Sequence, residues 1–356
     1  MRINRHAMLA ITFLFTTTLA RAEKVVLVAG GDKAVLPSPA VEGKLDGPFG
    51  VDLLPTGSLV VVEMLGGRVL RIDPSGMMEL RAGIGGKGFA GDEGPAQQAQ
   101  FNGPHNLVVD KGGDIFIADT WNNRIRRIDS KNRVTTYAGT GAKGYSGDGS
   151  AAAHAEFGGI YCIAFDASQK NLYIADLDNK RIRVIDTQRA IVTSIAGNGK
   201  SGVPQDGDDA RQAPLVDPRA VAADDKGNVY ILERKGNSLR IVDAAGKIRT
   251  VVGPKVSVTT DEEGKTPKSL KGPKHLCIDR ESNVIIADSD NHQIRKYIPG
   301  EKKLVTIVGT GKAGNKGVGG SPLEVELNQP HGVFVDPEGT LFIADSSNNR
   351  VLKISK

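Results

Sequence analysis

A sequence unit of about 56 residues recurs six times along this chain. Each copy opens with a short motif whose second position falls at residue 48, 104, 160, 218, 273 or 330. That position is Pro in every copy except the third, which has Ile160. A fixed period of this size is typical of a protein assembled from stacked structural repeats.

Each unit predicts four short β-strands separated by turns. In the second unit the apolar runs cover residues 107–110, 115–119, 124–129 and 134–138, with Gly, Asn or Asp between them. Such runs, divided by turn-forming residues, indicate an antiparallel sheet. Six four-stranded units predict an all-β fold, a six-bladed β-propeller.

The two ends of the chain predict how the ring closes. The sixth unit stops at Lys356, after its third expected strand, while residues 24–31 resemble a fourth strand that has no unit of its own. Pairing this N-terminal strand with the last unit would complete the sixth blade and leave no open edge. We therefore expect one propeller domain over residues 23–356.

The first 22 residues have the pattern of a secretory signal peptide. Arg2 and Arg5 precede an apolar stretch, and Ala20-Arg21-Ala22 offers a small-residue cleavage site. The apolar stretch is short for a membrane span, so we expect a secreted or periplasmic protein with no span after cleavage.

Without the three arginines of this segment, the chain has 43 basic and 41 acidic residues, which gives a net charge of +2. This balance argues against nucleic-acid binding, and we expect a monomer.

Two segments carry the motif of a known repeat family. Residues 101–107 read Phe-Asn-Gly-Pro-His-Asn-Leu, and residues 117–126 contain Ala-Asp-Thr-Trp-Asn-Asn-Arg, which residues 341–350 match. The sequence resembles the NHL repeat, over about residues 24–356, and in particular secreted NHL propellers of bacterial type. The resemblance implies a rigid scaffold that presents loops to a ligand.

A repeated acid and a basic residue suggest a structural pair in each blade. The second expected strand ends in an acid in all six units: Glu63, Asp119, Asp176, Glu233, Asp288 and Asp345. Five residues later stand Arg68, Arg124, Arg181, Ser238, Gln293 and Arg350. Because an Arg can form a forked hydrogen bond with a carboxylate, we expect the acid to pair with this Arg where one is present.

Long segments rich in Gly and Asp connect the units. In an up-and-down blade they lie on the same face as the turns between second and third strands, so we expect binding there. The cluster Asp206–Asp209 lacks the spacing of a calcium loop, and we interpret it as turn structure. Trp121 lies in one of these turns, either as an exposed binding aromatic or packed locally.

The six residues that follow the repeated Pro position, one from each unit, are the strongest candidates for a functional site in the sequence. Around the ring they are Phe49, His105, Tyr161, Arg219, Lys274 and His331, which should meet at the channel mouth. In one interpretation His105 and His331, with His275 beside them, bind a divalent metal, zinc or calcium, while Tyr161 and Arg219 act on a substrate. The Pro-His contexts resemble those of peptide-amidating lyase propellers. In the other interpretation the set is a polar lining without metal.

The two cysteines, Cys162 and Cys277, lie at different depths of non-adjacent units, so we expect no disulfide between them. The leading functional hypothesis is a binding platform for an extracytoplasmic protein, peptide or glycan. In it, His105, Tyr161, Arg219, Lys274, His331 and Trp121 contact the ligand. The alternative is a metal-dependent lyase or hydrolase, of amidating-lyase or lactonase type, at the channel mouth.

Overall fold

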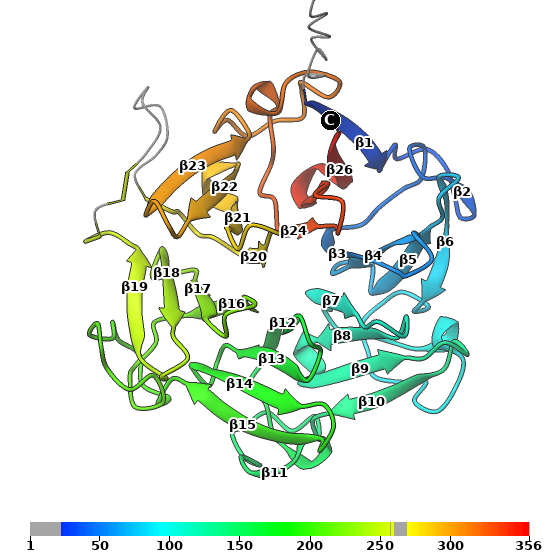
Figure 1. Ribbon diagram of the computed structural model, residues 1–356. Helices are drawn as coiled ribbons and strands as arrows, with labels where there is room; N and C mark the ends of the chain where they lie inside the picture. Colours follow the sequence, from blue (N-terminus) through cyan, green and yellow to red (C-terminus); the bar gives the residue numbers. More distant parts are fainter. Residues whose placement is uncertain (1–22, 257, 260–268, 356) are drawn as a thin grey trace, which may run out of the picture.

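The computed structural model describes residues 23–256, 258–259 and 269–355, and the expected signal peptide lies outside them. Within these ranges six antiparallel sheets stand around a common axis (Figure 1). The predicted six-bladed β-propeller is therefore confirmed. No helix in these ranges has the length and apolar character that a membrane crossing requires.

The strands of each described blade follow one another from the axis to the rim. The innermost strands are β3 (Pro48–Leu53), β7 (Asn106–Val109), β12 (Ile160–Phe165), β16 (Pro218–Ala223), β20 (His275–Ile278) and β24 (Gly332–Val335). The second strands are β4 (Leu59–Glu63), β8 (Ile115–Asp119), β13 (Asn171–Asp176), β17 (Val229–Glu233), β21 (Val284–Asp288) and β25 (Leu341–Asp345). The third strands are β5 (Arg68–Ile72), β9 (Arg124–Ile128), β14 (Arg181–Asp186), β18 (Ser238–Val242), β22 (Gln293–Ile298) and β26 (Arg350–Ser355). The outermost strands are β6 (Met77–Ala82), β10 (Val134–Ala138), β15 (Ile191–Ala196), β19 (Ile248–Val252), β23 (Lys303–Val308) and β1 (Lys24–Ala29).

The N-terminal strand closes the ring as predicted. β1 pairs antiparallel with β26, and Val25 lies opposite Ile354 (Figure 1). Val25 is fully buried beside Leu352 in the hydrophobic cluster between the fifth and sixth blades. The last blade therefore has four strands and presents no open edge to its neighbours.

Short 3-10 helices occupy two kinds of connection. Three follow the second strand of a blade: η2 (Thr120–Asn122), η4 (Ser289–Asn291) and η6 (Ser346–Asn348). Their hydroxyl groups reach the next blade, since Thr120 donates to the Ile160 carbonyl at 2.7 Å and Ser346 to the Pro48 carbonyl at 2.6 Å. The others, η1 (Ala96–Gln98), η3 (Ala152–His154) and η5 (Pro322–Glu324), lie between blades.

The long inter-blade segments were expected on the face of the 2–3 turns, but parts of them lie along the rim of the propeller. They begin and end on the face of the 2–3 turns, but their middles cover the outer edge of the following blade. β2 (Ser38–Pro39) pairs with β6, and β11 (Ser150–Ala151) pairs with β15. An edge strand exposes unpaired N–H and C=O groups, and these segments satisfy them. The segments therefore cover the rim as well as contributing to one face.

In each described blade one arginine pairs with the buried acid at the end of the second strand, and this arginine is itself buried in every blade except the first, where Arg68 is 28% exposed. Blades one and six use the expected pairs, Glu63–Arg68 at 2.6 Å and Asp345–Arg350 at 2.7 Å. Blades two to five use an Arg seven residues after the acid, in the pairs Asp119–Arg126, Asp176–Arg183, Glu233–Arg240 and Asp288–Arg295. The five-residue prediction was thus wrong for Asp119 and Asp176. Arg124 and Arg181 instead lie over the rings of Phe89 and Tyr145.

The acidic inter-blade segments hold this framework through hydrogen bonds and ion pairs. Asp92 reaches Arg126 at 2.6 Å, and Asp148 reaches Arg183 at 2.7 Å. Asp206 accepts a hydrogen bond from the backbone N–H of Thr250 at 2.7 Å. These contacts give the acids a structural role in the wall of the blade.

Candidate functional site

The residues after the repeated Pro position meet around the channel mouth. The ring of Phe49 stacks on His331 with centroids 3.7 Å apart, and its edge faces His105 at 5.2 Å. His105 contacts Tyr161 edge-on at 4.6 Å, and the Arg219 guanidinium lies 4.2 Å from the centre of the Tyr161 ring. We call Phe49, His105, Tyr161, Arg219, Lys274 and His331 the mouth ring.

Close backbone packing permits this stacking. Gly332 follows His331 at the start of β24, and a Cβ atom on it would lie within about 2 Å of the Phe49 carbonyl oxygen. Any larger residue would separate β24 from β3. The Phe49 and His331 rings would then lose contact.

Backbone carbonyls fix the tautomers of both histidines in the mouth ring. His105 Nδ1 lies 2.7 Å from the Gly103 carbonyl oxygen, and His331 Nδ1 lies 3.2 Å from that of Gln329. Because a carbonyl only accepts, each Nδ1 carries the proton and each Nε2 keeps a lone pair. Burial, followed by nearby positive charge, lowers the pKa of both side chains. Both are therefore neutral hydrogen-bond acceptors at pH 7.

Arg219 is a buried cation with two nitrogen atoms that lack hydrogen-bond partners in the described part of the chain. The residue is 4% exposed, and its Nε and Nη1 atoms have no hydrogen-bond partner among the described residues. Burial, and then the charge of Arg234, lowers its pKa to about 10, so it stays charged at pH 7. Arg234 is itself paired with Asp217 at 2.9 Å. Buried guanidinium N–H groups without acceptors are costly, so this site favours an anion.

Lys274 adds a second positive charge beside Arg219. Burial, and then the charge of Arg219, lowers its pKa to about 8. The nearby exposed acid Asp290 raises the pKa of Lys274, but by less than burial and Arg219 lower it. The mouth ring therefore combines two cations with little negative charge to balance them.

Trp121 stands at the edge of the mouth ring, on η2. Its side chain is 43% exposed, and its ring lies 5.8 Å from His105 and 5.4 Å from the Lys87 Nζ. Trp121 is therefore partly packed against its neighbours and partly exposed to solvent, and its role in binding stays a prediction.

His275 lies one layer deeper than the mouth ring and spans the channel. Its Nε2 is 3.1 Å from the Asn106 side-chain amide, and these two residues come from opposite blades. Asn106 Oδ1 also accepts the Ile163 N–H, while the Val333 N–H donates to His275 Nδ1. The other members of this layer are small: Gly50, Cys162, Ala220 and Gly332. We call the Asn106–His275 pair the cross-channel bar.

The three histidines do not fit a single metal site. The Phe49 ring lies between His105 and His331, and His275 is engaged in the bar. No group of three His, Cys, Asp or Glu side chains in the described part of the chain is arranged to hold a metal ion. Both cysteines are free, as expected.

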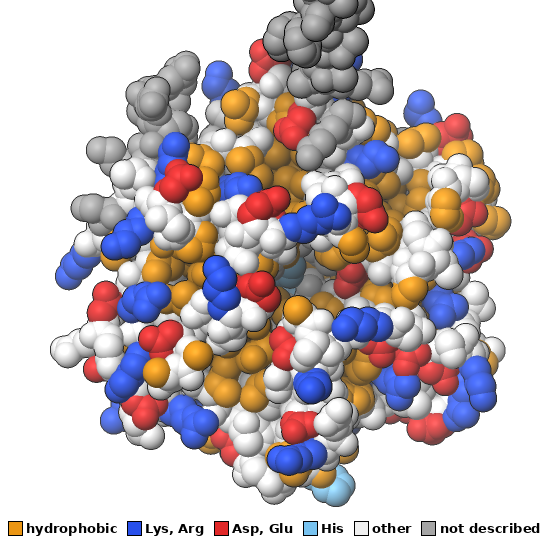
Figure 2. Space-filling model, in the orientation of Figure 1, with side chains coloured by type: hydrophobic (Ala, Val, Ile, Leu, Met, Phe, Trp, Pro, Cys, Tyr) orange, Lys and Arg blue, Asp and Glu red, His pale blue; other side chains and the backbone are white. Residues whose placement is uncertain are grey.

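A cavity that the sequence did not predict lies along the axis on the opposite face. It has a volume of about 470 Å³ and is lined by inner strands from all the described blades. Figure 2 shows one face of the ring, hollowed at its centre. The cross-channel bar separates this axial cavity from the mouth ring. The alignment that defined the mouth ring contains one signal for this cavity, an acid at a strand position where every other blade has no charge. Asp52 stands where the other blades carry Val108, Ala164, Ala222, Cys277 and Phe334.

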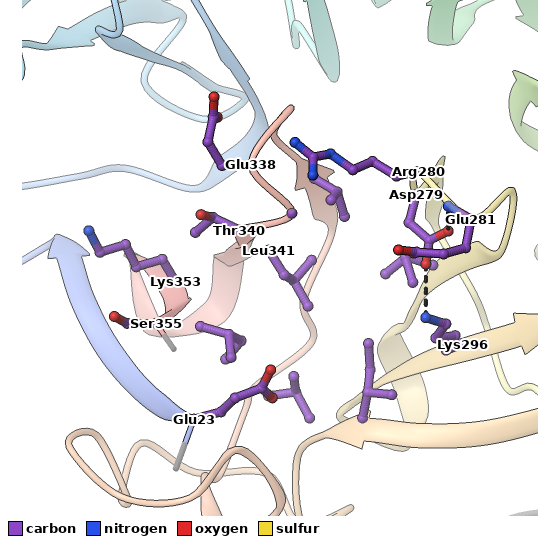
Figure 3. Close-up of a pocket in the computed structure, with 16 residues that line it drawn as sticks. Glu23, Asp279, Arg280, Glu281, Lys296, Glu338, Thr340, Leu341, Lys353 and Ser355 are labelled. Carbon is purple, nitrogen blue, oxygen red and sulfur yellow. Dashed lines mark hydrogen bonds and ion pairs between the residues drawn. The ribbon is translucent and has the colours of Figure 1, made fainter. Parts of the chain in front are cut away.

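A further cavity of about 610 Å³ lies between the fifth and sixth blades (Figure 3). Its labelled side chains carry charges of both signs, among them Glu338 and Lys353 (Figure 3). Lys296 is already paired with Asp279 at 2.9 Å. This mixture favours no particular ligand charge.

Comparison with known proteins identifies the repeat. The model of the NHL repeat matches residues 101–128 and 327–354, and that of the teneurin NHL domain matches residues 186–267. The chain is a β-propeller in which residues 101–128 and 327–354 match the NHL repeat. Among solved structures, an auxiliary nutrient binding protein from Bacteroides ovatus superimposes with a TM-score of 0.65 and 15% identity, covering 94% of this chain and 76% of that one. Virginiamycin B lyase from Staphylococcus aureus gives a TM-score of 0.53 and 13% identity, covering 94% and 99%. At these identities the likeness shows the fold alone.

Curated relatives share the repeats within longer proteins. The chloroplastic protein SUPPRESSOR OF QUENCHING 1 of Arabidopsis thaliana is 29% identical over 75% of this chain and 26% of its own length. NHL repeat-containing protein 2 of Gallus gallus is 25% identical over 75% of this chain and 41% of its own length. The chain therefore spans between a quarter and a half of the length of these relatives.

Proposed function

We propose that this NHL propeller is an extracytoplasmic binding module that holds an acidic glycan at its mouth ring. The observation that carries the proposal is Arg219, whose buried guanidinium lacks hydrogen-bond acceptors for Nε and Nη1. A carboxylate would supply them and pair with the charge. Lys274 would contact the same group from the neighbouring blade.

The rest of the mouth ring favours a sugar acid over a simple anion. The Nε2 atoms of His105 and His331 are acceptors, which suit the hydroxyl groups of a sugar. Trp121, which is 43% exposed, offers aromatic surface to the C–H face of a sugar ring. Acidic sugars combine a carboxylate, hydroxyl groups and an apolar face in one small unit.

Two further considerations support this reading. The signal-like residues 1–22 favour export to a compartment where free glycans occur. Among proteins of similar fold is one described as an auxiliary nutrient binding protein. A rigid ring that collects loop and strand ends at one mouth is a common arrangement for ligand binding.

Calorimetric titration with matched ligands tests the proposal. The ligands are short oligosaccharides of uronic acids and the same oligosaccharides with each carboxyl group reduced to an alcohol. We expect the acids to bind and the alcohols to bind at least about tenfold more weakly, since a charge-assisted hydrogen bond contributes about 1.5–3 kcal/mol. Peptides with a free or amidated C-terminus serve as a second pair.

Arg219→Gln is the decisive variant, and Arg211→Gln is its control. Arg211 is exposed in the segment between β15 and β16, so its loss removes the same charge away from the mouth ring. Arg219→Gln should abolish the preference for the acid, and Arg211→Gln should retain it. Equal binding of acids and alcohols by the wild type would refute the proposal, and a preference for free peptide carboxylates over sugars would assign the site to peptides.

A further inference from the structure

The axial cavity is open to solvent at one end, and apolar side chains of the inner strands form much of its wall. Its wall includes Val108, Val109, Ala164, Phe165, Ala222, Ala223, Ile278 and Phe334. The cross-channel bar forms its inner end, because both Asn106 and His275 line the cavity. Its volume of about 470 Å³ lies in the range of small-molecule sites.

Asp52 places a carboxyl group in this apolar space. Its Oδ1 accepts the Leu53 N–H at 2.7 Å, and its Oδ2 accepts the Val109 N–H at 2.8 Å. Neither bond brings a positive charge, and no basic side chain in the described ranges forms an ion pair with Asp52. Burial raises its pKa to about 7, although the two backbone hydrogen bonds favour the charged form.

The other titratable groups inside the cavity stay neutral near pH 7. Burial, and then the charge of Arg219, lowers the pKa of His275 to about 4. Burial raises the pKa of the Cys277 thiol. Asp52 is therefore the group within the described cavity that changes charge near neutral pH.

The rim of the cavity is mainly acidic. Asp166, Asp224, Asp225 and Asp279 line it, together with one base, Arg280, and Asp279 is paired with Lys296 at 2.9 Å. Asp166, Asp224 and Asp279 also accept backbone N–H groups in tight turns, which holds them in place. Such a rim attracts cations and repels anions.

We propose that the axial cavity binds a small organic cation, with its ammonium group on Asp52 and its apolar body against the cavity wall. The site lies on the face opposite the mouth ring and is separated from it by the cross-channel bar. It is therefore a second site, independent of the glycan proposed above. A cation next to Asp52 would supply the charge that its backbone hydrogen bonds do not.

Cyclohexylammonium and cyclohexanol are suitable probes because they share their apolar ring and differ in charge. Calorimetric titration of the whole chain at pH 7.5 should show binding of the ammonium at least about tenfold tighter than that of the alcohol. Asp52→Asn should remove this preference and leave cyclohexanol binding unchanged. Equal affinities for the two probes, no binding of either, or an unchanged preference in Asp52→Asn would each overturn the proposal.

Glu301→Gln is the matched control. Glu301 is exposed between β22 and β23, does not line the cavity, and loses the same charge. It should bind both probes as the wild type does. Arg219→Gln should also retain ammonium binding, so failure at one site is distinguishable from failure at the other.

Proton release gives a second readout that a folding defect would not imitate. Because a bound ammonium favours ionised Asp52, binding at pH 7 should release protons, seen as a dependence of the heat on the buffer's ionisation enthalpy. Asp52→Asn should show no such dependence. Binding without proton release in the wild type would place the cation elsewhere.

Discussion

The charge of Lys274 determines how the mouth ring responds to pH. Its pKa of about 8 means that it carries a proton at pH 7 and loses it as the pH rises through 8. His105 and His331 are already neutral there, and Arg219 stays charged up to about pH 10. The affinity for an acidic glycan should therefore fall by about tenfold between pH 7 and 9.

Titrations of wild type and Lys274→Gln at several pH values check this expectation. The variant should bind more weakly at pH 7 and show no further loss up to pH 9. A wild-type affinity that is constant over this range would exclude Lys274 from the site.

At the residue scale the sequence predicted the membership of the mouth ring, because one strand position repeats in every blade. It did not predict the cross-channel bar or the unpaired state of Arg219. Both features depend on which side chains from different blades meet across the axis. The periodicity along one strand carries no information about contacts between blades. The position of Asp52 was readable from the same alignment.

At the scale of the strand, we expect the acid–Arg pair to stabilise a blade most where both side chains are buried. Arg240 and Glu233 are almost fully buried and lie 2.5 Å apart. Arg240→Met would leave the carboxylate uncompensated, so we expect the free energy of unfolding to fall by about 3–5 kcal/mol. Urea unfolding followed by circular dichroism measures this change.

The exposed pair Arg133–Glu93 provides the comparison, since its side chains are 50% and 71% exposed. Arg133→Met should cost no more than about 1 kcal/mol. If both variants lost the same stability, burial would not be the source of the effect at Arg240.

The sequence also indicated four strands per unit but placed their arginine partners wrongly in two blades. Arg124 and Arg126 both follow Asp119 on one strand, and alternate residues of a strand share a face. Spacing alone could not choose between them. The inter-blade segment favours Arg126, because Asp92 pairs with it, whereas the Arg124 guanidinium donates to the Thr140 carbonyl instead.

At the scale of the whole molecule, the ring depends on β1 to complete its last blade. Val25 is fully buried, whereas the adjacent Lys24 on the same strand is exposed. Val25→Asp would bury an unpaired charge and should lower the free energy of unfolding by about 3 kcal/mol or more. Lys24→Asp should change it by less than about 0.5 kcal/mol. Equal effects of the two substitutions would mean that β1 does not close the ring in solution.

The closed ring gives the molecule two faces with opposite charge preference. The mouth ring presents Arg219 and Lys274, while the axial cavity presents Asp52 behind an acidic rim. The cross-channel bar lies between the two spaces, so ligands at the two proposed sites would not compete for the same atoms.

The most direct test of the mouth ring uses Trp121, the single tryptophan of the chain. Its ring lies 5.8 Å from His105, so its fluorescence reports on this site. A uronic-acid oligosaccharide should change the Trp121 emission saturably at pH 7 in the wild type and in Arg211→Gln, whereas Arg219→Gln should bind it at least about tenfold more weakly. A saturable change of the same affinity in Arg219→Gln, or no binding to the wild type, would contradict the account.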